Sequence, residues 1–273
     1  MSERAASMFR ISDSEFSQFQ RFIYEAAGIT LGSAKKALVS GRLAKRLHAC
    51  KVNSYSEYFR VLKGGNAAEL QIAIDLLTTN ETYFFREPNH FQFLKQQIAS
   101  DAFRTSSLRV WSAAGSTGEE AYSIAMLLED SLPGQPWEVV ASDISTRVLE
   151  RARAGHYSMD RIDNFPPGYL QRFCLKGRDE QAGTMLIQRA LRGKVRFLQV
   201  NLNAALPHLG MFDVVFLRNV LIYFNNETKR KVVARVLSVL KPDGYLFIGH
   251  SESLIDVSEA VDLVAPAIYR KAS

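Results

Sequence analysis

The chain has 273 residues, the length of one large domain or two modest ones. Its 47% apolar and 23% charged residues exclude a disordered protein, and its net charge of +6 permits an anionic partner without requiring nucleic acid. Two cysteines, Cys50 and Cys174, exclude a disulfide scaffold and a paired-cysteine zinc motif. No apolar run reaches the ~20 residues of a membrane span, and the N-terminal stretch lacks the apolar core of a signal peptide. We therefore expect a cytoplasmic protein.

The first part of the chain is predicted to be helical. Ser12 and Glu15 fit a capping box at a helix start, and apolar residues then recur at helical spacing. Similar patterns predict helices over 34–50, 54–62 and 67–77. We expect an all-α domain over residues 1–79, then a linker and cofactor-contacting segment over 80–107.

From Leu108 onward, strand and helix patterns alternate. Four short apolar runs, each preceded or followed by a helical stretch, predict parallel βαβ units in an α/β domain over 108–273. They are "LRVWSAA", "WEVVASDI", "FDVVFLRN" and "GYLFIGH". A last run, "AIYRKAS", fits an edge strand. Short β-like runs separated by glycines and charged turns predict a small antiparallel insertion at about 165–200.

The segment from Arg109 to Met126 carries the strongest signal for a ligand. A strand runs into Gly115 and Gly118, which allow a ligand to approach the backbone before a helix begins. Alone, this pattern fits a plain tight turn equally well. Asp143, 25 residues after Gly118, ends the next predicted strand, where an acid can accept hydrogen bonds from both ribose hydroxyls.

Two acids at the helix start indicate which nucleoside is bound. Glu119 and Glu120 would repel a pyrophosphate there, but they suit a cationic ligand without phosphates. S-adenosylmethionine, with its ammonium and sulfonium, is such a ligand, so a methyltransferase is favoured over a dehydrogenase. The alternative for the two glutamates is stabilisation of the helix N-terminus by ~0.3–1 kcal/mol each.

Nearly the whole chain resembles the chemotaxis receptor glutamate O-methyltransferases. The resemblance rests on "LLTTNETYFFREPNHF", "WSAAGSTGEEAYSIAM", "VVASDIS" with "VLERARAGHY", and "FDVVFLRNVLIYF" with "LKPDGYLFIGHSE". It implies a helical N-terminal domain and a Rossmann-like methyltransferase domain with an inserted antiparallel β-subdomain. It also implies methyl transfer from S-adenosylmethionine to glutamates of chemoreceptors, giving methyl esters and S-adenosylhomocysteine for sensory adaptation.

The turn and the resemblance together imply a set of cofactor-binding residues. Glu120 matches the residue that meets the methionine ammonium or nearby cofactor atoms, and Asp143 matches the ribose-binding acid. Asn201 and Leu202 match the residues at the adenine end, and Arg218 and Asn219 match the residues beside the methionyl moiety. Relatives usually have Cys or Ala where Gly115 stands and Pro where Ala121 stands, and neither change removes a binding side chain. The expected set is Asn80, Thr82, Arg86, Gly115, Glu120, Asp143, Asn201, Leu202, Arg218 and Asn219.

The expected chemistry requires neither a general base nor a metal. A glutamate carboxylate, with a pKa of about 4.3, is already the nucleophile at neutral pH, so His90 and His250 are not expected to act as bases. Arg86 is predicted to orient the acceptor carboxylate, with a salt bridge to an acid such as Glu87 as the alternative. Tyr223 is predicted to line the acceptor pocket, with core packing as the alternative.

Six basic residues and no acid lie between Ala34 and Lys51. These basic residues can simply form a solvated helix face. The resemblance implies instead a surface that meets the acidic helical bundle of a chemoreceptor. The predicted docking residues are Lys35, Lys36, Arg42, Lys45 and Arg46. A receptor C-terminal peptide is a possible ligand of the β-insertion, and recruitment to membrane receptor arrays without membrane insertion is expected.

Two other functions remain open. A nucleic-acid methyltransferase would agree with the basic charge, but the chain lacks the Asn-Pro-Pro-Tyr type of motif, and its corresponding strand ends in "RNVLIYF". A regulatory scaffold that binds S-adenosylmethionine without turnover is the other alternative.

Overall fold

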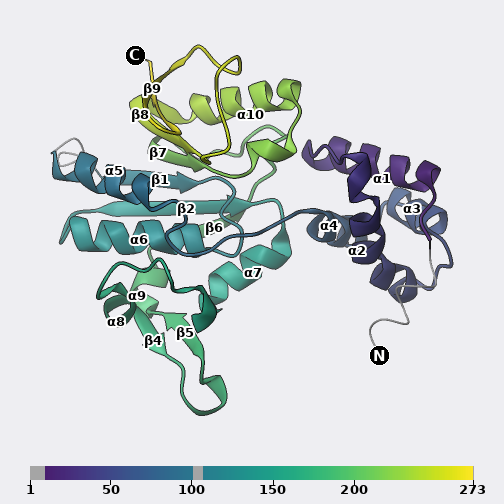
Figure 1. Ribbon diagram of the computed structural model, residues 1–273, viewed down its shortest axis with the longest axis horizontal. Helices are drawn as coiled ribbons and strands as arrows, with labels where there is room; N and C mark the ends of the chain where they lie inside the picture. Colours follow the sequence, from purple (N-terminus) through teal and green to yellow (C-terminus); the bar gives the residue numbers. More distant parts are fainter. Residues whose placement is uncertain (1–9, 101–106, 273) are drawn as a thin grey trace. The chain divides into compact units, whose positions relative to one another are not determined.

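The computed structural model describes residues 10–100 and 107–272 (Figure 1). Its contacts divide the chain into a helical unit, residues 1–79 with 223–228, and a sheet unit, residues 80–222 with 229–273. Residues 1–9, on which the expectation about a signal peptide partly depends, lie outside the described residues. No helix in the described part of the chain is long and apolar enough to cross a membrane.

The helical unit forms where the capping and periodicity signals predict it. The capping box is confirmed, because Ser12 Oγ accepts a hydrogen bond from Glu15 N and Glu15 Oε2 accepts one from Ser12 N. The buried ring of Phe19 packs against aromatic side chains of the third helix, including Tyr55 and Tyr58. The elements are α1 (Asp13–Ala27), the 3-10 turn η1 (Ser33–Lys35), α2 (Lys36–Ala49), α3 (Tyr55–Lys63) and α4 (Ala67–Leu77).

A seven-stranded sheet forms the centre of the sheet unit. Its order is β6-β2-β1-β7-β8-β10-β9. The first five strands run parallel, and β10 runs antiparallel to both of its neighbours, β8 and β9. The strands are β1 (Leu108–Ser112), β2 (Trp137–Asp143), β6 (Val195–Gln199), β7 (Phe212–Leu217), β8 (Leu240–Ile248), β9 (Val261–Ala265) and β10 (Ile268–Lys271). The central strands are nearly continuously buried, as expected for a parallel sheet covered on both faces. The predicted α/β fold is confirmed.

Four longer helices accompany this sheet: α5 (Pro88–Ala99), α6 (Glu119–Ser131), α7 (Thr146–Ala154) and α10 (Asn226–Ser238). Helix α5 lies in the predicted linker and was not predicted. Its N-cap Glu87 makes no side-chain cap hydrogen bond, although Pro88 at its start is a helix signal. Strand β9 was not predicted either. The run predicted as an edge strand is β10, and its edge position is wrong, because β10 pairs with β8 on one side and β9 on the other.

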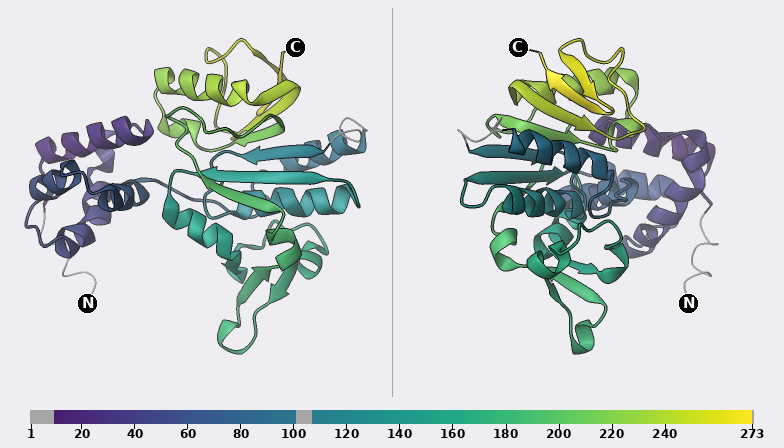
Figure 2. Two further views of the ribbon diagram at one scale, coloured as in Figure 1. Left: turned by 180° about the vertical axis from the view of Figure 1, so that it is seen from behind. Right: turned by 60° about the vertical axis from the view of Figure 1, so that its left-hand side comes forward.

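A small antiparallel sheet is present, but its bounds differ from those predicted. It has the order β3-β5-β4 and lies at the opposite end of the sheet unit from β9 and β10 (Figures 1 and 2). Its elements are β3 (His156–Ser158), η2 (Met159–Arg161), α8 (Tyr169–Phe173), β4 (Cys174–Lys176), η3 (Asp179–Gln181), β5 (Thr184–Ile187) and α9 (Arg189–Arg192). The run at Val195, predicted to belong to the insertion, is β6 of the main sheet. It resembles an insertion strand because it is a half-exposed edge strand.

The parallel topology determines where a ligand can bind. The carboxyl ends of β1, β2 and β7 meet at one edge of the sheet because these neighbouring strands run in the same direction. Ligands of such sheets bind outside that edge. The predicted site residues Gly115, Asp143 and Arg218 directly follow or end these three strands.

Candidate cofactor site

The turn between β1 and α6 has one glycine that no other residue can replace without strain. Gly118 has φ 96°, and a Cβ there would lie 2.9 Å from both Ala152 Cβ and Tyr157 Oη. Gly115 is not left-handed, and its Cβ would lie 3.0 Å from Ser112 Oγ, a tight contact. The turn closes through a hydrogen bond from Gly118 N to Gly115 O (2.9 Å). Gly118 is therefore needed for the turn to pack against α7 and β3.

Asp143 ends β2 beside this turn, and its carboxylate is held by backbone donors. Ser116 N donates to Oδ2 (3.0 Å) and Ser145 N donates to Oδ1 (2.9 Å). The residue is 7% exposed. These donors fix the orientation of a carboxylate that can accept about four hydrogen bonds in all. This orientation suits recognition of a ribose.

Arg218, which follows β7, is shared by two carboxylates. Its side chain is 1% exposed; Nη1 lies 3.2 Å from Glu120 Oε2, and Nη2 lies 3.1 Å from Glu87 Oε2. Ser112 Oγ donates to Glu120 Oε1 (2.7 Å). We name Glu87, Glu120 and Arg218 the shared-arginine cluster. With both carboxylates ionised, one positive and two negative charges leave it with a net charge of −1.

The two carboxyl groups of this cluster are shifted in opposite directions. Burial raises the pKa of Glu120, and the nearby Arg218 guanidinium opposes that effect without cancelling it. Burial also acts to raise the pKa of Glu87, but Arg218, the Asn219 amide and His250 outweigh it and hold that pKa below its ordinary value. Glu120 is therefore the acid that gains most from an added cation.

Glu87 was considered as a salt-bridge partner for Arg86, but its ion-pair partner here is Arg218. Arg86 donates from Nη1 to the carbonyl of Glu81 (3.1 Å), and its guanidinium lies 5.6 Å from the ring centroid of Tyr83. The backbone carbonyl of Arg86 accepts a hydrogen bond from Arg218 Nη2. The predicted segment therefore reaches the cluster through its backbone and Glu87.

The same segment is fastened to the glycine turn and to α6. Ser116 Oγ donates to the carbonyl of Asn80 (2.9 Å), and Ser123 Oγ accepts from Phe85 N (2.9 Å). Thr82 is buried. These contacts bring the first predicted site residues to the turn that carries Gly115.

The residues expected at the adenine lie beside Asp143. They follow β6, the neighbour of β2, and Val200 N donates to the carbonyl of Asp143 (3.1 Å). Asn201 Oδ1 accepts from Asn203 N (2.9 Å), and Leu202 is 7% exposed. A polar and an apolar side chain thus follow each other next to the ribose-binding acid.

Tyr223 and the predicted docking residues belong to the helical unit. Tyr223 is half-buried, and its carbonyl accepts from Thr30 N (2.8 Å). Its place at an acceptor pocket stays a prediction, as does the catalytic role of Arg86.

The predicted docking residues on and before α2 are not equivalent. Arg46 forms a two-pronged ion pair with Glu69 (2.9 and 2.6 Å), and Arg42 donates to the carbonyl of Thr78 (2.9 Å). Lys36 pairs with Asp13 (2.6 Å), whereas Lys35 and Lys45 are exposed. Only the two exposed lysines are available without breaking a contact within the unit.

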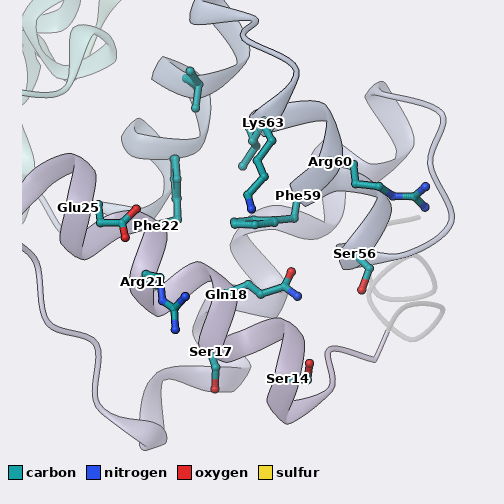
Figure 3. Close-up of a pocket in the computed structure, with 12 residues that line it drawn as sticks. Ser14, Ser17, Gln18, Arg21, Phe22, Glu25, Ser56, Phe59, Arg60 and Lys63 are labelled. Carbon is teal, nitrogen blue, oxygen red and sulfur yellow. The ribbon is translucent and has the colours of Figure 1, made fainter.

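The helical unit also has a groove of about 970 Å³ between α1, α3 and α4 (Figure 3). Its exposed cations are Arg21, Arg60 and Lys63, and Lys63 Nζ lies 5.0 Å from the centroid of Phe59. These cations belong to α1 and α3, so reversing their charge can serve as a control for charge reversal on and before α2.

Sequence analysis missed the importance of Glu87 and of the loop after β8. Ligand atoms of Glu87, His90 and His250 lie within 4.8 Å of one another, a spacing that could hold a metal. Arg218 already lies 3.1 Å from Glu87 Oε2 and would repel a cation there, so we assign no metal to this cluster. The only available signal was the acid next to Arg86 in the predicted segment.

These features fit S-adenosylmethionine better than a dinucleotide. With both carboxylates ionised, the shared-arginine cluster is net negative, as a ligand ammonium requires. A pyrophosphate at this helix N-terminus would meet the carboxylate of Glu120. Glu119, by contrast, is 2% exposed and accepts a hydrogen bond from Thr117 Oγ1 (2.6 Å), so it is not placed to meet a ligand.

Comparisons with known proteins agree with this assignment. Residues 80–269 match the CheR methyltransferase, SAM binding domain, and residues 14–78 match the CheR methyltransferase, all-alpha domain. The chain is 40% identical to a chemotaxis protein methyltransferase of Escherichia coli, over 98% of this chain and 93% of that protein. It is 39% identical to chemotaxis protein methyltransferase 2 of Pseudomonas aeruginosa, over 97% and 95% respectively. With its site geometry and both domains matched, the chain belongs to the CheR methyltransferase family.

Proposed function

We infer that this protein is an S-adenosylmethionine-dependent protein-glutamate methyltransferase of chemotaxis. It converts glutamate side chains of chemoreceptors to methyl esters and releases S-adenosylhomocysteine, for sensory adaptation. The single observation that carries this function is the net negative shared-arginine cluster beside Asp143, at the carboxyl edge of the sheet. The family match supplies the substrate class.

The residues of the chain divide the work of binding and positioning. When bound, S-adenosylmethionine supplies an electrophilic methyl group on a positively charged sulfur. Asp143 accepts hydrogen bonds from the ribose, and Glu120 balances the ammonium that Arg218 alone would repel. Gly118 allows the turn before α6 to pack against Ala152 and Tyr157.

The acceptor needs orientation more than activation. A glutamate side chain is ionised at neutral pH, so its carboxylate attacks without a general base. Arg86 presents a planar guanidinium that can hold this carboxylate in one plane. No metal is required for this displacement, and we propose that none takes part.

Label transfer separates this function from its two alternatives. Incubating the protein with methyl-labelled S-adenosylmethionine, receptor cytoplasmic fragments and RNA should place alkali-labile label in the receptor. Label in RNA would favour a nucleic-acid methyltransferase, and binding without any transfer would favour a scaffold. Arg86→Ala should abolish transfer, and full retained transfer would remove Arg86 from the mechanism.

The exposed lysines before and on α2 are proposed to meet the acidic helical bundle of the receptor. Charge reversal by Lys35→Glu with Lys45→Glu should raise KM for receptor fragments several-fold at low salt and leave cofactor affinity unchanged. Reversing Arg42 or Arg46 would confuse docking with folding, because both have partners within the helical unit.

The groove of the helical unit offers the matched control. Arg21→Glu with Arg60→Glu makes the same change of net charge on α1 and α3, at exposed positions. Equal effects of the two double variants would show that only total charge matters and would contradict an α2 docking face.

The small sheet is proposed to bind a receptor C-terminal peptide by strand addition. Its outer strands are β3 and β4, and Leu175 on β4 is 54% exposed. Calorimetric titration of such a peptide tests this, with Leu175→Lys expected to weaken binding. We further propose that the protein works in the cytoplasm and is recruited to membrane receptor arrays.

A further inference from the structure

The turn after β7 holds a non-glycine residue in an uncommon backbone conformation. Asn219 has φ 54°, in the left-handed region, which few non-glycine residues adopt and which Asn tolerates better than most. It directly follows Arg218 of the shared-arginine cluster, and its Nδ2 donates to Glu87 Oε1 (3.2 Å). The backbone and the side chain of Asn219 both take part in contacts that fix this turn.

Glu252, in the loop after β8, provides those contacts. Its Oε2 accepts hydrogen bonds from Asn219 N (2.8 Å) and Gly249 N (2.6 Å), and its Oε1 accepts from Ile222 N (3.1 Å). One carboxylate thus ties both sides of the turn after β7 to the end of β8. Burial raises the pKa of Glu252, so keeping a carboxylate there has a cost that the backbone donors offset only in part.

A glycine allows this loop to lie against the side chain of Asn219. A Cβ on Gly249 would lie 2.3 Å from Asn219 Nδ2 and 2.9 Å from Glu252 Oε2. Both distances are too short for any side chain, so the backbone of Gly249 covers the amide directly. The Asn219 amide is therefore confined between Gly249 and Glu87.

We propose that Glu252 is a positioning residue for methyl transfer, holding Asn219 and Arg218 in the arrangement that the methionine end of the cofactor requires. It acts through a chain of contacts: Glu252 to Asn219 N, Asn219 Nδ2 to Glu87, and Glu87 to Arg218. Glu252 itself need not touch the cofactor. This inference rests on the proposed function, because it gives a purpose to the same cluster.

The decisive variant is Glu252→Gln, whose amide presents an N–H to at least one of the three backbone donors. We expect the dissociation constant for S-adenosylmethionine to rise about tenfold by calorimetry, while kcat at saturating cofactor falls less. Hydrogen exchange at the amides of Asn219 and Ile222 should become faster. Glu259→Gln, an exposed acid of the same unit, removes the same charge and should change none of these.

Two further variants keep the test sharp. Glu252→Asp retains the charge with a shorter reach and should give an intermediate loss of affinity; it replaces Glu252→Gln if that variant fails to fold. In a double-mutant cycle with Asn219→Ala, the double variant should lose little more affinity than Asn219→Ala alone, because Glu252 acts through Asn219.

The outcomes separate this inference from the proposed function. If the parent protein does not bind S-adenosylmethionine, the proposed function fails. If the parent binds, but Glu252→Gln keeps the affinity of the Glu259→Gln control and merely melts earlier, Glu252 is structural and the inference is overturned. Fully additive losses in the cycle, or unchanged exchange at Asn219, would also overturn it.

Discussion

Two arginine–glutamate contacts, a partly buried one in the helical unit and a buried one in the sheet unit, use the same chemistry for different ends. In the helical unit, Arg46 meets Glu69 through two hydrogen bonds, and Tyr58 Oη donates a third (2.7 Å). In the sheet unit, Arg218 divides its guanidinium between Glu87 and Glu120. The first pair is balanced one charge to one; the second has a carboxylate in excess.

This difference in charge balance also shifts the pKa values of Glu69 and Glu120 in opposite directions. Burial acts to raise the pKa of Glu69, but Arg46 and Tyr58 outweigh it and lower that pKa. For Glu120 burial prevails, and its pKa is raised. We call the Arg46–Glu69 pair saturated, because each charge has one opposite charge, and the carboxylate of Glu120 unsaturated, because Arg218 is shared with Glu87. A saturated pair stabilises the fold, whereas an unsaturated carboxylate can bind a cation from outside. The same distinction explains why Arg46 is a poor candidate for receptor docking.

The largest expected effect is that of breaking the saturated pair. Arg46→Ala leaves Glu69, 7% exposed in its side chain, without its cation and should lower the free energy of unfolding by about 3–5 kcal/mol. Urea denaturation measures this, with the exposed Lys45→Ala as the control. Cofactor affinity of the folded fraction should not change. A loss below about 1 kcal/mol would show that the pair is not structural.

Removing the unsaturated carboxylate of Glu120 should lower cofactor affinity but not the free energy of unfolding, the reverse of the effect expected for Arg46→Ala. Glu120→Gln should weaken S-adenosylmethionine binding by about 1.5–3 kcal/mol, roughly 10- to 100-fold, without lowering the free energy of unfolding. The fold is spared because the variant removes a carboxylate whose burial is not fully compensated. Calorimetry and urea denaturation test both parts, with the exposed Glu150→Gln as the control. Equal loss of stability and affinity would contradict the comparison.

Local patterns in the sequence predicted the elements of both units but not their pairings. The helix over 67–77 and the strands at β1, β2 and β7 could be predicted because caps, glycines and apolar periodicity act within a few residues. Helix α5 was missed because its N-cap Glu87 makes no side-chain cap hydrogen bond, although Pro88 at its start and the helical spacing of its buried residues were available signals. The edge strand β9 was missed because its exposed residues do not alternate.

In the candidate site, too, local sequence patterns predicted single residues but not their long-range partners. Asp143 and Glu120 were predictable because they stand at fixed distances from a glycine turn. The partners of Arg46, Arg218 and Glu252 were not, because the long-range contacts of these residues join positions at least 23 apart: Arg46 with Glu69, Arg218 with Glu120, and Glu252 with Asn219. In sequence, Arg46 and Lys45 are equivalent members of one basic run; only three-dimensional contacts separate a structural cation from an exposed one.

A buried histidine beside the cluster extends the comparison to pH. His90 is 0% exposed, and burial, with Arg218 nearby, lowers its pKa to about 3 from 6.5. Below pH 6.5 the unfolded chain binds a proton that the folded chain does not, so the free energy of unfolding falls as pH decreases from 6.5 toward 3. The contribution is about 1.4 kcal/mol at pH 5.5.

Urea denaturation at pH 7.5 and pH 5.5 isolates this contribution. His90→Leu should lose about 1.4 kcal/mol less than the parent between the two pH values, whatever its absolute stability. His208→Gln, at an exposed position, should retain the parental pH dependence. An unchanged difference in His90→Leu would mean that His90 is protonated in the folded protein.

The smallest effect is expected at the glycine turn, where two glycines near the unsaturated carboxylate differ in kind. Gly115→Ala places a Cβ 3.0 Å from Ser112 Oγ, the hydroxyl that donates to Glu120, at a φ that any residue adopts. A small shift of this hydroxyl relieves the contact, so we expect less than about 1 kcal/mol of destabilisation and at most a few-fold loss of cofactor affinity. Gly118→Ala, at φ 96° and 2.9 Å from Ala152 Cβ, is the contrasting variant and should lose considerably more of both. If Gly115→Ala instead lowered cofactor affinity as much as Glu120→Gln, the hydrogen bond from Ser112 to Glu120 would be essential for binding. The excess negative charge alone would then not explain cofactor binding.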